Sequence, residues 1–243
     1  MSAGTSPESD AHDQQAATAD APRDTALSHL AAQRVEYLAA DLSEVAADPG
    51  SQFAAWYEEA AAQVAEPNAM VVATADASGP SARVVLLKEF GPEGFVFFTN
   101  YDSLKGRQLA ADPRIALTFP WHDMQRQVRV RGVAEPTSAA VSDEYFASRA
   151  RGAQLSAVAS AQSQPVRSRA DLEAAYAQAQ ERFGSGPVER PAHWGGYLVR
   201  PSEVEFWQGR GNRFHDRYAF TSADGRPARL DDPSAWTIVR LNP

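Results

Sequence analysis

The sequence predicts an α+β protein in which helices pack around one mainly antiparallel, barrel-like sheet. From residue 69 onward, short runs of β-branched and aromatic residues follow one another, separated by turn sequences such as DASGPS and GPEG. Stretches of good helix formers interrupt these runs. The 243 residues suffice for one sizeable domain or two small ones, and 44% of them are hydrophobic, enough for a real core.

The first 28 residues are predicted to be a disordered acidic tail, followed by one domain over residues 29–243. The tail is rich in Ala, Ser, Asp, Gln and Thr and has no large apolar cluster, so it cannot offset the entropy lost on ordering. Five acids and one base, Arg23, lie in the first 30 residues and make up half of the net charge of −8. The rest of the chain is therefore only mildly acidic.

The first helix is expected to begin at Ser51 as its N-cap and to be closed by Pro67. Phe53, Trp56 and Val64 lie at spacings that suit an amphipathic helix. After this helix, β-branched and aromatic runs predict strands at residues 69–75, 82–90, 94–100, 114–121 and 127–135.

Three more helices and three more strands are expected in the rest of the chain. A short helix over residues 103–113 has Ser103 as its cap, a second helix covers residues 138–152, and a third over residues 169–184 is stopped by Gly184. The sheet is expected to resume with strands at residues 195–209, 213–220 and 236–241.

Composition excludes several classes of function. The chain has no cysteine, which rules out disulfides, thiolate catalysis and Cys-based zinc sites, and its histidines lack partners at ligand spacing, so no metal site is expected. No apolar run approaches the ~20 residues that span a bilayer. No basic segment followed by an apolar one opens the sequence, so we expect a soluble, cytoplasmic protein that does not bind membranes. The acidic balance argues against a nucleic-acid partner and favours small anions.

Two basic clusters lie in the first half of the chain. The stretch RVVLLK has cationic ends, and in a regular strand Arg83 and Lys88 point to opposite faces. They either serve two anions or mark the solvated ends of the strand. Lys105 lies in the first turn of the helix capped by Ser103, where free N–H groups attract phosphate; an ordinary serine cap is the alternative.

A third cluster pairs a phenol with a guanidinium. Tyr145 and Arg149 are four residues apart in a predicted helix and would share one face of it. The rigid donor fork of arginine beside a tyrosine hydroxyl makes a good phosphate clamp. The alternative is a half-buried tyrosine beside a solvated arginine.

The fourth cluster is FWQGRGNRFHDR, in which Arg213, His215 and Arg217 occupy every second position. In an extended strand these side chains share one face, and the turn QGRGN could bring Trp207 near it. Such a pocket suits a planar aromatic ligand with acidic groups. A charged edge strand that resists aggregation is the alternative.

Over roughly residues 32–243 the chain resembles the pyridoxamine 5′-phosphate oxidase family. The resemblance rests on motifs in family order and at family spacing: NAMVVATAD, RVVLLK, FFTNYDSLKGRQL, FPWHDMQRQVRVRG, YFASRARGAQLS, AQSQPVRSR, HWGGYLVRPSEVEFWQG, NRFHDR and RLNP. It implies a split β-barrel homodimer with two FMN sites along the subunit interface. It also implies oxidation of pyridoxamine or pyridoxine 5′-phosphate to pyridoxal 5′-phosphate, with O2 reduced to H2O2.

The resemblance further implies roles for individual residues. Contacts to FMN would come from Arg83, Val84, Val85, Leu86, Leu87, Lys88, Phe98, Thr99, Lys105, Gln127, Gln162, Ser163, Trp207 and Arg217. Contacts to the substrate would come from Arg34, Tyr37, Lys88, Tyr145, Arg149, Ala153, Arg213 and His215. The last two are the implied catalytic residues, with orienting and electrostatic roles, and His215 is also a candidate proton acceptor.

Three features depart from the family pattern. Leu104 stands where the family has an arginine beside Lys105, and Ala153 stands where it has a serine in the substrate phosphate clamp. Each change removes a hydrogen bond to a charged group, a loss of ~1.5–3 kcal/mol if nothing replaces it. The basic, glycine-containing stretch that often follows the N-terminal tyrosine in the family is missing after Tyr37.

Two other functions use the same fold or the same residues. Related split-barrel flavoproteins oxidise other ring compounds, such as phenazine precursors, although a substrate without phosphate would not need the clamp of Lys88, Tyr145 and Arg149. A non-catalytic carrier of flavin or pyridoxal phosphate would use the same binding residues as an enzyme. The absorbance spectrum of the protein and peroxide release with pyridoxine 5′-phosphate distinguish these hypotheses.

Overall fold

The computed structural model describes residues 1, 33, 35–39 and 41–243. The predicted tail beyond Met1, and Arg34 among the predicted substrate contacts, lie outside the described residues. Tyr37–Pro243 forms one compact unit, which carries all the helices and strands named below.

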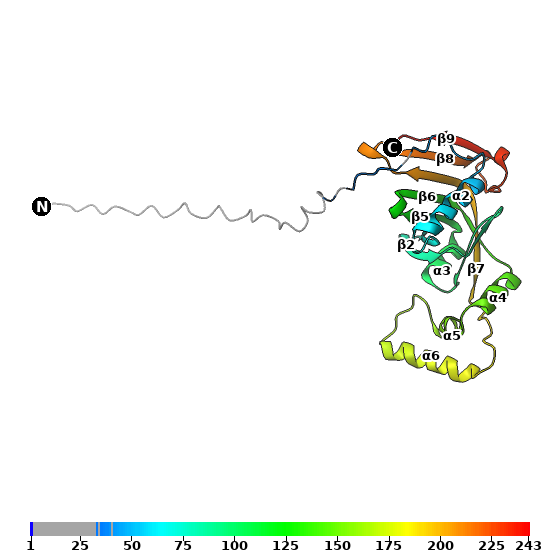
Figure 1. Cartoon of the computed structure of the whole chain (residues 1–243). Helices are drawn as coiled ribbons and strands as arrows, with labels where there is room; N and C mark the ends of the chain where they lie inside the picture. Colours follow the sequence, from blue (N-terminus) through cyan, green and yellow to red (C-terminus); the bar gives the residue numbers. More distant parts are fainter. Residues whose placement is uncertain (2–32, 34, 40) are drawn as a thin grey trace. The chain divides into compact units, whose positions relative to one another are not determined.

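Nine strands of the described chain form one antiparallel sheet, which confirms the predicted fold class (Figure 1). The strand order is β2-β1-β5-β6-β7-β4-β3, with β8 paired to β7 and β9 paired to β8. The strands are β1 Ala69–Asp76, β2 Gly79–Leu86, β3 Glu89–Gly91, β4 Gly94–Asn100, β5 Arg114–Trp121, β6 Arg126–Pro136, β7 Trp194–Gln208, β8 Asp216–Ser222 and β9 Trp236–Arg240.

Apolar residues at alternate positions make one face of the sheet apolar, and this face packs on the core. In β5 the buried residues Ile115, Leu117, Phe119 and Trp121 occupy every second position, as the two-residue repeat of a strand requires. Helix α2, Pro49–Gln63, covers this face.

The central side chain of α2 is Phe53, which is fully buried. Its ring centroid lies 5.0 Å from that of Phe95 and 5.1 Å from that of Phe119. Burial of one such side chain contributes about 1.5–3 kcal/mol to stability. The aromatic residues that predicted the helix and the strands therefore meet in one core.

The predicted ends of this first helix are wrong. Asp48 is the N-cap, because its carboxylate accepts a hydrogen bond of 2.7 Å from the backbone N–H of Ser51. Pro49 takes the first helical position, where its fixed φ suits the helix, so the helix begins before Ser51. The helix ends at Gln63, because the backbone of Val64 is already extended.

The other helices lie between β4 and β7 in the sequence. Ser103 caps α3 as predicted, its hydroxyl accepting from the N–H of Gly106, and α6 stops as predicted at Gly184. Figure 1 shows α5 and α6 side by side, at the end of the sheet where β7 begins. The helices are α3 Leu104–Ala111, α4 Ala139–Ser148, α5 Arg151–Ala159 and α6 Arg169–Phe183, and short 3-10 turns cover His122–Met124, Gly211–Arg213 and Pro233–Ala235.

The single helix predicted over residues 138–152 is in fact two. Helix α4 ends at Ser148, the backbone of Arg149 is extended (φ −72°, ψ 148°), and α5 begins at Arg151. The amide group of Gln154 donates to the carbonyl oxygens of Phe146 and Ala147, at 2.9 and 3.2 Å. This side chain satisfies carbonyls that a continuing helix would have used, which favours the break.

The strand predicted over residues 82–90 is also divided. Strand β2 ends at Leu86 and β3 begins at Glu89, and Lys88 lies between them. The backbone N–H of Lys88 donates to the carbonyl oxygen of Val96 in β4, at 2.8 Å. The chain leaves its partner β1 here and pairs with β4, so Arg83 and Lys88 do not belong to one regular strand.

Candidate functional site

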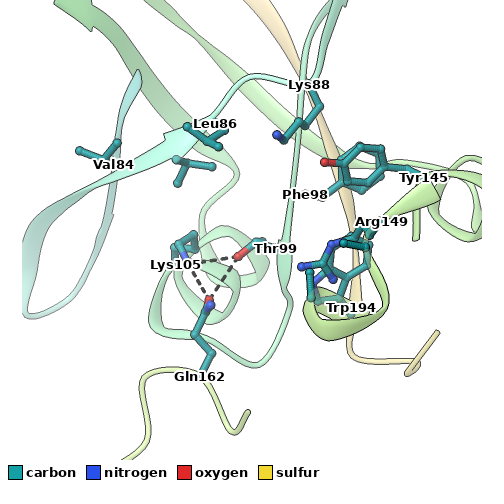
Figure 2. A pocket seen from close by; sticks show the side chains of 13 residues that line it. Val84, Leu86, Lys88, Phe98, Thr99, Lys105, Tyr145, Arg149, Gln162 and Trp194 are labelled. Carbon is teal, nitrogen blue, oxygen red and sulfur yellow. Dashed lines mark hydrogen bonds between the residues drawn. The ribbon is translucent and has the colours of Figure 1, made fainter. Parts of the chain in front are cut away.

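A cavity of about 530 Å³ opens where β2, β4, α3 and the α4–α5 junction meet. Figure 2 shows its lining side chains converging from these elements. All lining residues except Ala150 and Trp194 were predicted from the sequence as cofactor or substrate contacts. The lining consists of Val84, Val85, Leu86, Lys88, Phe98, Thr99, Lys105, Tyr145, Arg149, Ala150, Ala153, Gln162 and Trp194.

Lys105 is a buried cation at one end of this cavity. Its Nζ donates to Oε1 of Gln162 at 2.8 Å and to Oγ1 of Thr99 at 3.1 Å (Figure 2). It also donates to Oγ of Ser103 at 3.3 Å. Burial, and then the nearby charge of Arg83, lowers the pKa of Lys105 to about 8. Since all three acceptors are uncharged, an anion bound here would supply the countercharge. Ser103 therefore serves both as the helix cap and as a partner of Lys105.

Arg83 does not line the cavity. Its guanidinium donates to Oγ1 of Thr74 at 2.7 Å, to Oγ of Ser81 at 2.6 Å and to the carbonyl oxygen of Val72 at 3.1 Å. The side-chain oxygen of Gln108 accepts from the same two hydroxyl groups. This network fixes Arg83 within the sheet, from where its charge acts on Lys105 through space.

The predicted phosphate clamp comes together despite the break between α4 and α5. Lys88, Tyr145 and Arg149 line the same side of the cavity (Figure 2). The ring of Tyr145 stacks on Phe98, with centroids 3.9 Å apart and planes at 17°. Arg149 lies over the indole of Trp194, with Cζ 4.6 Å from the ring centroid.

The guanidinium of Arg149 is only partly satisfied. Its Nη1 is buried and makes no hydrogen bond within the described part of the chain. Burial lowers the pKa of Arg149, and the electrostatic interaction with Tyr145 opposes that shift. A buried charged donor without a partner is costly, so this nitrogen is suited to bind an anionic ligand group.

A second group of predicted residues lies elsewhere. Tyr37, Gln127 and Trp207 line a smaller cavity of about 230 Å³ together with His122, Gln125 and Arg126, which were not predicted. His215 is adjacent, with its ring centroid 4.6 Å from that of Trp207 and 5.8 Å from that of Tyr37.

The prediction that Arg213, His215 and Arg217 share one face of one strand is wrong. Strand β8 begins only at Asp216, and the chain before it turns through Asn212 and Arg213, whose φ values are +55° and +60°. Asparagine tolerates this left-handed conformation, which ends the regular alternation of side chains. Arg213 is exposed, whereas His215 is half-buried beside Trp207.

His215 is held by a backbone donor. The N–H of Arg210 donates to Nδ1 of His215 at 3.0 Å. When the ring is neutral, its proton is therefore on Nε2. Burial, and then the charge of Arg213, lowers the pKa of His215, which favours the neutral ring.

Arg217 lies in β8 directly opposite Trp207 in β7. Its Nε donates to Oε1 of Glu205 at 2.8 Å, and its Nη1 donates to the carbonyl oxygen of Asn242 at 2.9 Å. The carboxylate of Glu205 is buried and also accepts from Arg129 at 3.0 Å. Arg217 is thus fixed by an ion pair and by the C-terminal segment.

The residues of the large cavity and those of the small cavity lie at opposite ends of β7. Phe98 of the large cavity pairs with Gly196, and Gln127 of the small cavity pairs with Trp207. Gly196 and Trp207 are 11 residues apart, which is about 35 Å of extended chain at ~3.3 Å per residue. One chain therefore does not bring all the predicted contacts into a single cavity.

Four predicted cofactor contacts lie outside both cavity linings: Arg83 and Arg217, described above, and Leu87 and Ser163. Leu87 is buried in the main core, and Ser163 is exposed with a φ of +68°. Among the described residues, no cluster of three His, Asp or Glu side chains is arranged to hold a metal ion. No helix in that part of the chain is both long and apolar enough to cross a membrane.

The described chain is an α+β protein with one antiparallel sheet and a cationic cavity, and comparison with known proteins gives its family. The family model described as pyridoxamine 5′-phosphate oxidase matches residues 57–183, and the model described as the pyridoxine 5′-phosphate oxidase C-terminal dimerisation region matches residues 194–243. The pyridoxine/pyridoxamine 5′-phosphate oxidase of Rubrobacter xylanophilus is 51% identical over 218 residues, 88% of this chain and 96% of that protein. The chain belongs to the pyridoxine/pyridoxamine 5′-phosphate oxidase family and is an oxidoreductase.

Solved structures show the same fold. PhzG from Burkholderia lata 383, in complex with tetrahydrophenazine-1-carboxylic acid, superposes with a TM-score of 0.74 at 26% identity, covering 86% of this chain and 99% of PhzG. An FMN-binding protein related to pyridoxamine 5′-phosphate oxidase, from Nostoc punctiforme, gives a TM-score of 0.62 at 17% identity and covers 82% of this chain and all of that one. The second likeness concerns the fold alone.

Proposed function

We propose that the protein uses FMN to oxidise pyridoxamine 5′-phosphate or pyridoxine 5′-phosphate to pyridoxal 5′-phosphate, with O2 reduced to H2O2. The observation that carries the proposal is the presence of two separate cationic groups in one cavity. Lys105 lies at one end among uncharged acceptors, and Arg149 with its unpaired Nη1 lies beside Lys88 and Tyr145. A phosphorylated cofactor and a phosphorylated substrate require two such groups.

The residues of the cavity fit FMN. Lys105, Thr99 and Gln162 would hold its phosphate, because the desolvated ammonium group needs a countercharge and the neighbouring side chains can reorient to donate. Phe98 and the backbone of β2 would line the flavin site. When bound, FMN supplies a two-electron acceptor that O2 can reoxidise.

We also propose a homodimer in which one protomer completes the site of its partner. The argument is the separation of the two residue groups along β7, since Gln127, Trp207 and Arg217 are predicted to contact the same FMN that Lys105 binds. The match of residues 194–243 to a dimerisation region supports this arrangement. A cytoplasmic location stays a prediction from the sequence.

The residues near the reacting ring would orient it rather than remove its protons. Nδ1 of His215 already accepts from the N–H of Arg210, so the neutral ring presents Nε2–H as a donor. This geometry favours hydrogen bonding to the substrate by His215 over its earlier interpretation as a proton acceptor. Arg213 would contribute a positive charge beside the substrate ring. Tyr37, which packs on Trp207, would cover the substrate ring.

The second candidate is oxidation of a ring compound without phosphate. The similarity to PhzG favours it, since that structure contains a phenazine-type carboxylic acid. The clamp of Lys88, Tyr145 and Arg149 favours the phosphate ester, because a carboxylic acid would leave part of this cationic surface unused. A non-catalytic carrier would bind the same ligands without producing peroxide.

The test measures the cofactor and the reaction separately. We expect the purified protein to be yellow, and heat-released cofactor to run as FMN rather than FAD in chromatography. Pyridoxine 5′-phosphate should then yield H2O2 and pyridoxal 5′-phosphate in equal amounts. Recovery of FAD, or turnover of a phenazine precursor but not of the phosphate ester, would overturn the proposal; bound FMN without peroxide would indicate a carrier.

A further inference from the structure

We infer that Trp194 is a positioning residue that makes the cavity select ligands carrying a phosphate group. Trp194 was not among the residues predicted to bind cofactor or substrate, yet it lines the cavity beside the clamp (Figure 2). The inference rests on the proposed function and adds to it the residue that holds Arg149 in place.

The first step is the conformation of Arg149. This residue follows the last turn of α4 with an extended backbone, so helix geometry does not fix its side chain. Its Cζ instead lies 4.6 Å from the ring centroid of Trp194 and 5.7 Å from that of Phe146. The indole face is the larger aromatic surface and the nearer one, and a cation on such a face is stabilised by the ring quadrupole.

The second step is the rigidity of Trp194 itself. Only 7% of the residue is exposed, and its ring stacks on Phe98 at 5.6 Å and 12° while meeting Phe146 edge-on at 5.2 Å. Its backbone is fixed as well, because its N–H donates to the carbonyl oxygen of Pro191 and its own carbonyl accepts from Arg190 at 2.6 Å. The surface that supports Arg149 is therefore preorganised.

The third step connects this support to selectivity. Nη1 of Arg149 is buried and unpaired within the described chain, so part of its hydration is lost before any ligand arrives. A phosphate oxygen offsets the lost hydration by accepting a charge-assisted hydrogen bond from Nη1. The neutral hydroxymethyl group of an unphosphorylated ring can accept only a weaker hydrogen bond. Without the indole, the guanidinium can turn toward water, and the difference in affinity between phosphorylated and unphosphorylated ligands decreases.

The experiment compares two ligands in three variants of the FMN-loaded protein. Affinities for pyridoxal 5′-phosphate and for pyridoxal are measured by calorimetry, beside kcat/KM for pyridoxine 5′-phosphate and for pyridoxine. Trp194→Leu removes the aromatic face, Trp194→Phe keeps a smaller one, and Trp236→Phe is the matched control, since Trp236 is equally buried (7%) outside both cavity linings. Thermal unfolding of each variant reports on the fold.

We expect Trp194→Leu to weaken pyridoxal 5′-phosphate binding about tenfold while pyridoxal binding stays within about twofold. Trp194→Phe should fall between this variant and the wild type, and it carries the test if Trp194→Leu fails to fold. Trp236→Phe should keep the full preference for phosphate. Equal weakening of both ligands, or an unchanged preference in both Trp194 variants, would overturn the inference and leave the proposed function intact. A wild type without preference for the phosphate ester would overturn the proposed function itself.

Discussion

The ammonium group of Lys105 donates to the side-chain oxygen of Gln162 at 2.8 Å and so joins the start of α3 to the segment that follows α5. The other two acceptors of Lys105, Thr99 and Ser103, are also uncharged. Burial lowers the pKa of this lysine to about 8, with the charge of Arg83 as the second cause. The group is therefore protonated at neutral pH and loses its proton in mildly alkaline solution.

The affinity of the FMN-free protein for FMN is expected to depend on this proton. An anionic phosphate favours protonated Lys105, so affinity should be constant below pH of about 8 and should fall above it, by up to tenfold per pH unit, until the pKa of the complex is reached. Titration of the apoprotein with FMN, followed by quenching of flavin fluorescence from pH 6.5 to 9.5, measures the profile.

Lys105→Arg is the control for this titration. Arginine stays protonated throughout the pH range, so its FMN affinity should no longer decrease above pH of about 8, even if its absolute affinity is lower. The same alkaline decrease in both proteins would mean that another group is responsible.

Asp48 is expected to stabilise the fold through α2. Asp48→Ala removes the acceptor of the Ser51 N–H bond and should lower the free energy of unfolding by about 1 kcal/mol, within a usual range of about 0.5–2 kcal/mol. Chemical denaturation measures the change. Ser51→Ala is the matched control: it removes only the hydroxyl that bonds to Asp48 and should cost less. A larger loss from Ser51→Ala would restore Ser51 as the important capping residue.

The fold could be predicted from the sequence because most of its signals are local. The strands β4 and β5 were predicted at their observed bounds, since turn residues flank each apolar run. Errors arose where a distant contact competes with local preference. The backbone N–H of Lys88 donates to the carbonyl oxygen of Val96 in β4, so Lys88 does not continue β2. The side chain of Gln154 donates to carbonyl oxygens near the end of α4, which favours the end of that helix.

The site was less predictable, because spacing in the sequence does not give the path of the chain. Tyr145 and Arg149 meet in one cavity although the helix that was to align them is broken. Arg213 and His215 lie outside the strand on which alternation had placed them, because two left-handed residues precede it. Trp194 belonged to a motif used for the resemblance, but its contact with Arg149 depends on a tertiary approach that no local pattern shows.

His215 is expected to act as a hydrogen-bond donor through Nε2. His215→Gln keeps an amide donor near that position and should retain more of kcat/KM than His215→Leu, by about tenfold for one lost hydrogen bond. Steady-state kinetics with pyridoxine 5′-phosphate at saturating FMN gives the comparison. Were His215 the essential proton acceptor, both substitutions would abolish turnover to the same extent.

The pH dependence of His215 gives an independent check. Burial and Arg213 lower its pKa below 6.5, so as the pH falls below 6.5 the unfolded chain takes up the proton before the folded protein does. The contribution of His215 to the free energy of unfolding should therefore decrease as the pH falls through this window. Nitrogen-15 NMR of the ring should show Nε2 protonated at pH 7 and a titration midpoint below 6.5; a midpoint above 6.5 would contradict the assignment.

Arg213 and Arg217 are expected to have different roles, although they are four residues apart. Arg217 is fixed in β8 by Glu205 and the carbonyl of Asn242, opposite Trp207, whereas Arg213 is exposed in the turn before the strand. Arg213→Ala should leave FMN affinity nearly unchanged and reduce kcat/KM for the phosphate ester about ten- to a hundredfold, the loss of one charge-assisted contact.

Arg217→Ala should instead weaken FMN binding by a similar factor, with activity partly restored by excess cofactor. It should also lower the thermal unfolding midpoint, because the buried carboxylate of Glu205 then keeps only Arg129 as a partner, and a buried charge that loses a partner is destabilising. Within the described chain Arg213 forms no ion pair with a buried carboxylate, so Arg213→Ala serves as the matched control for stability. Titration of FMN into each apoprotein, followed by kinetics at saturating FMN, separates the two effects. Equal loss of FMN affinity in both variants would show that the two arginines act on the same group, against the division of roles proposed here.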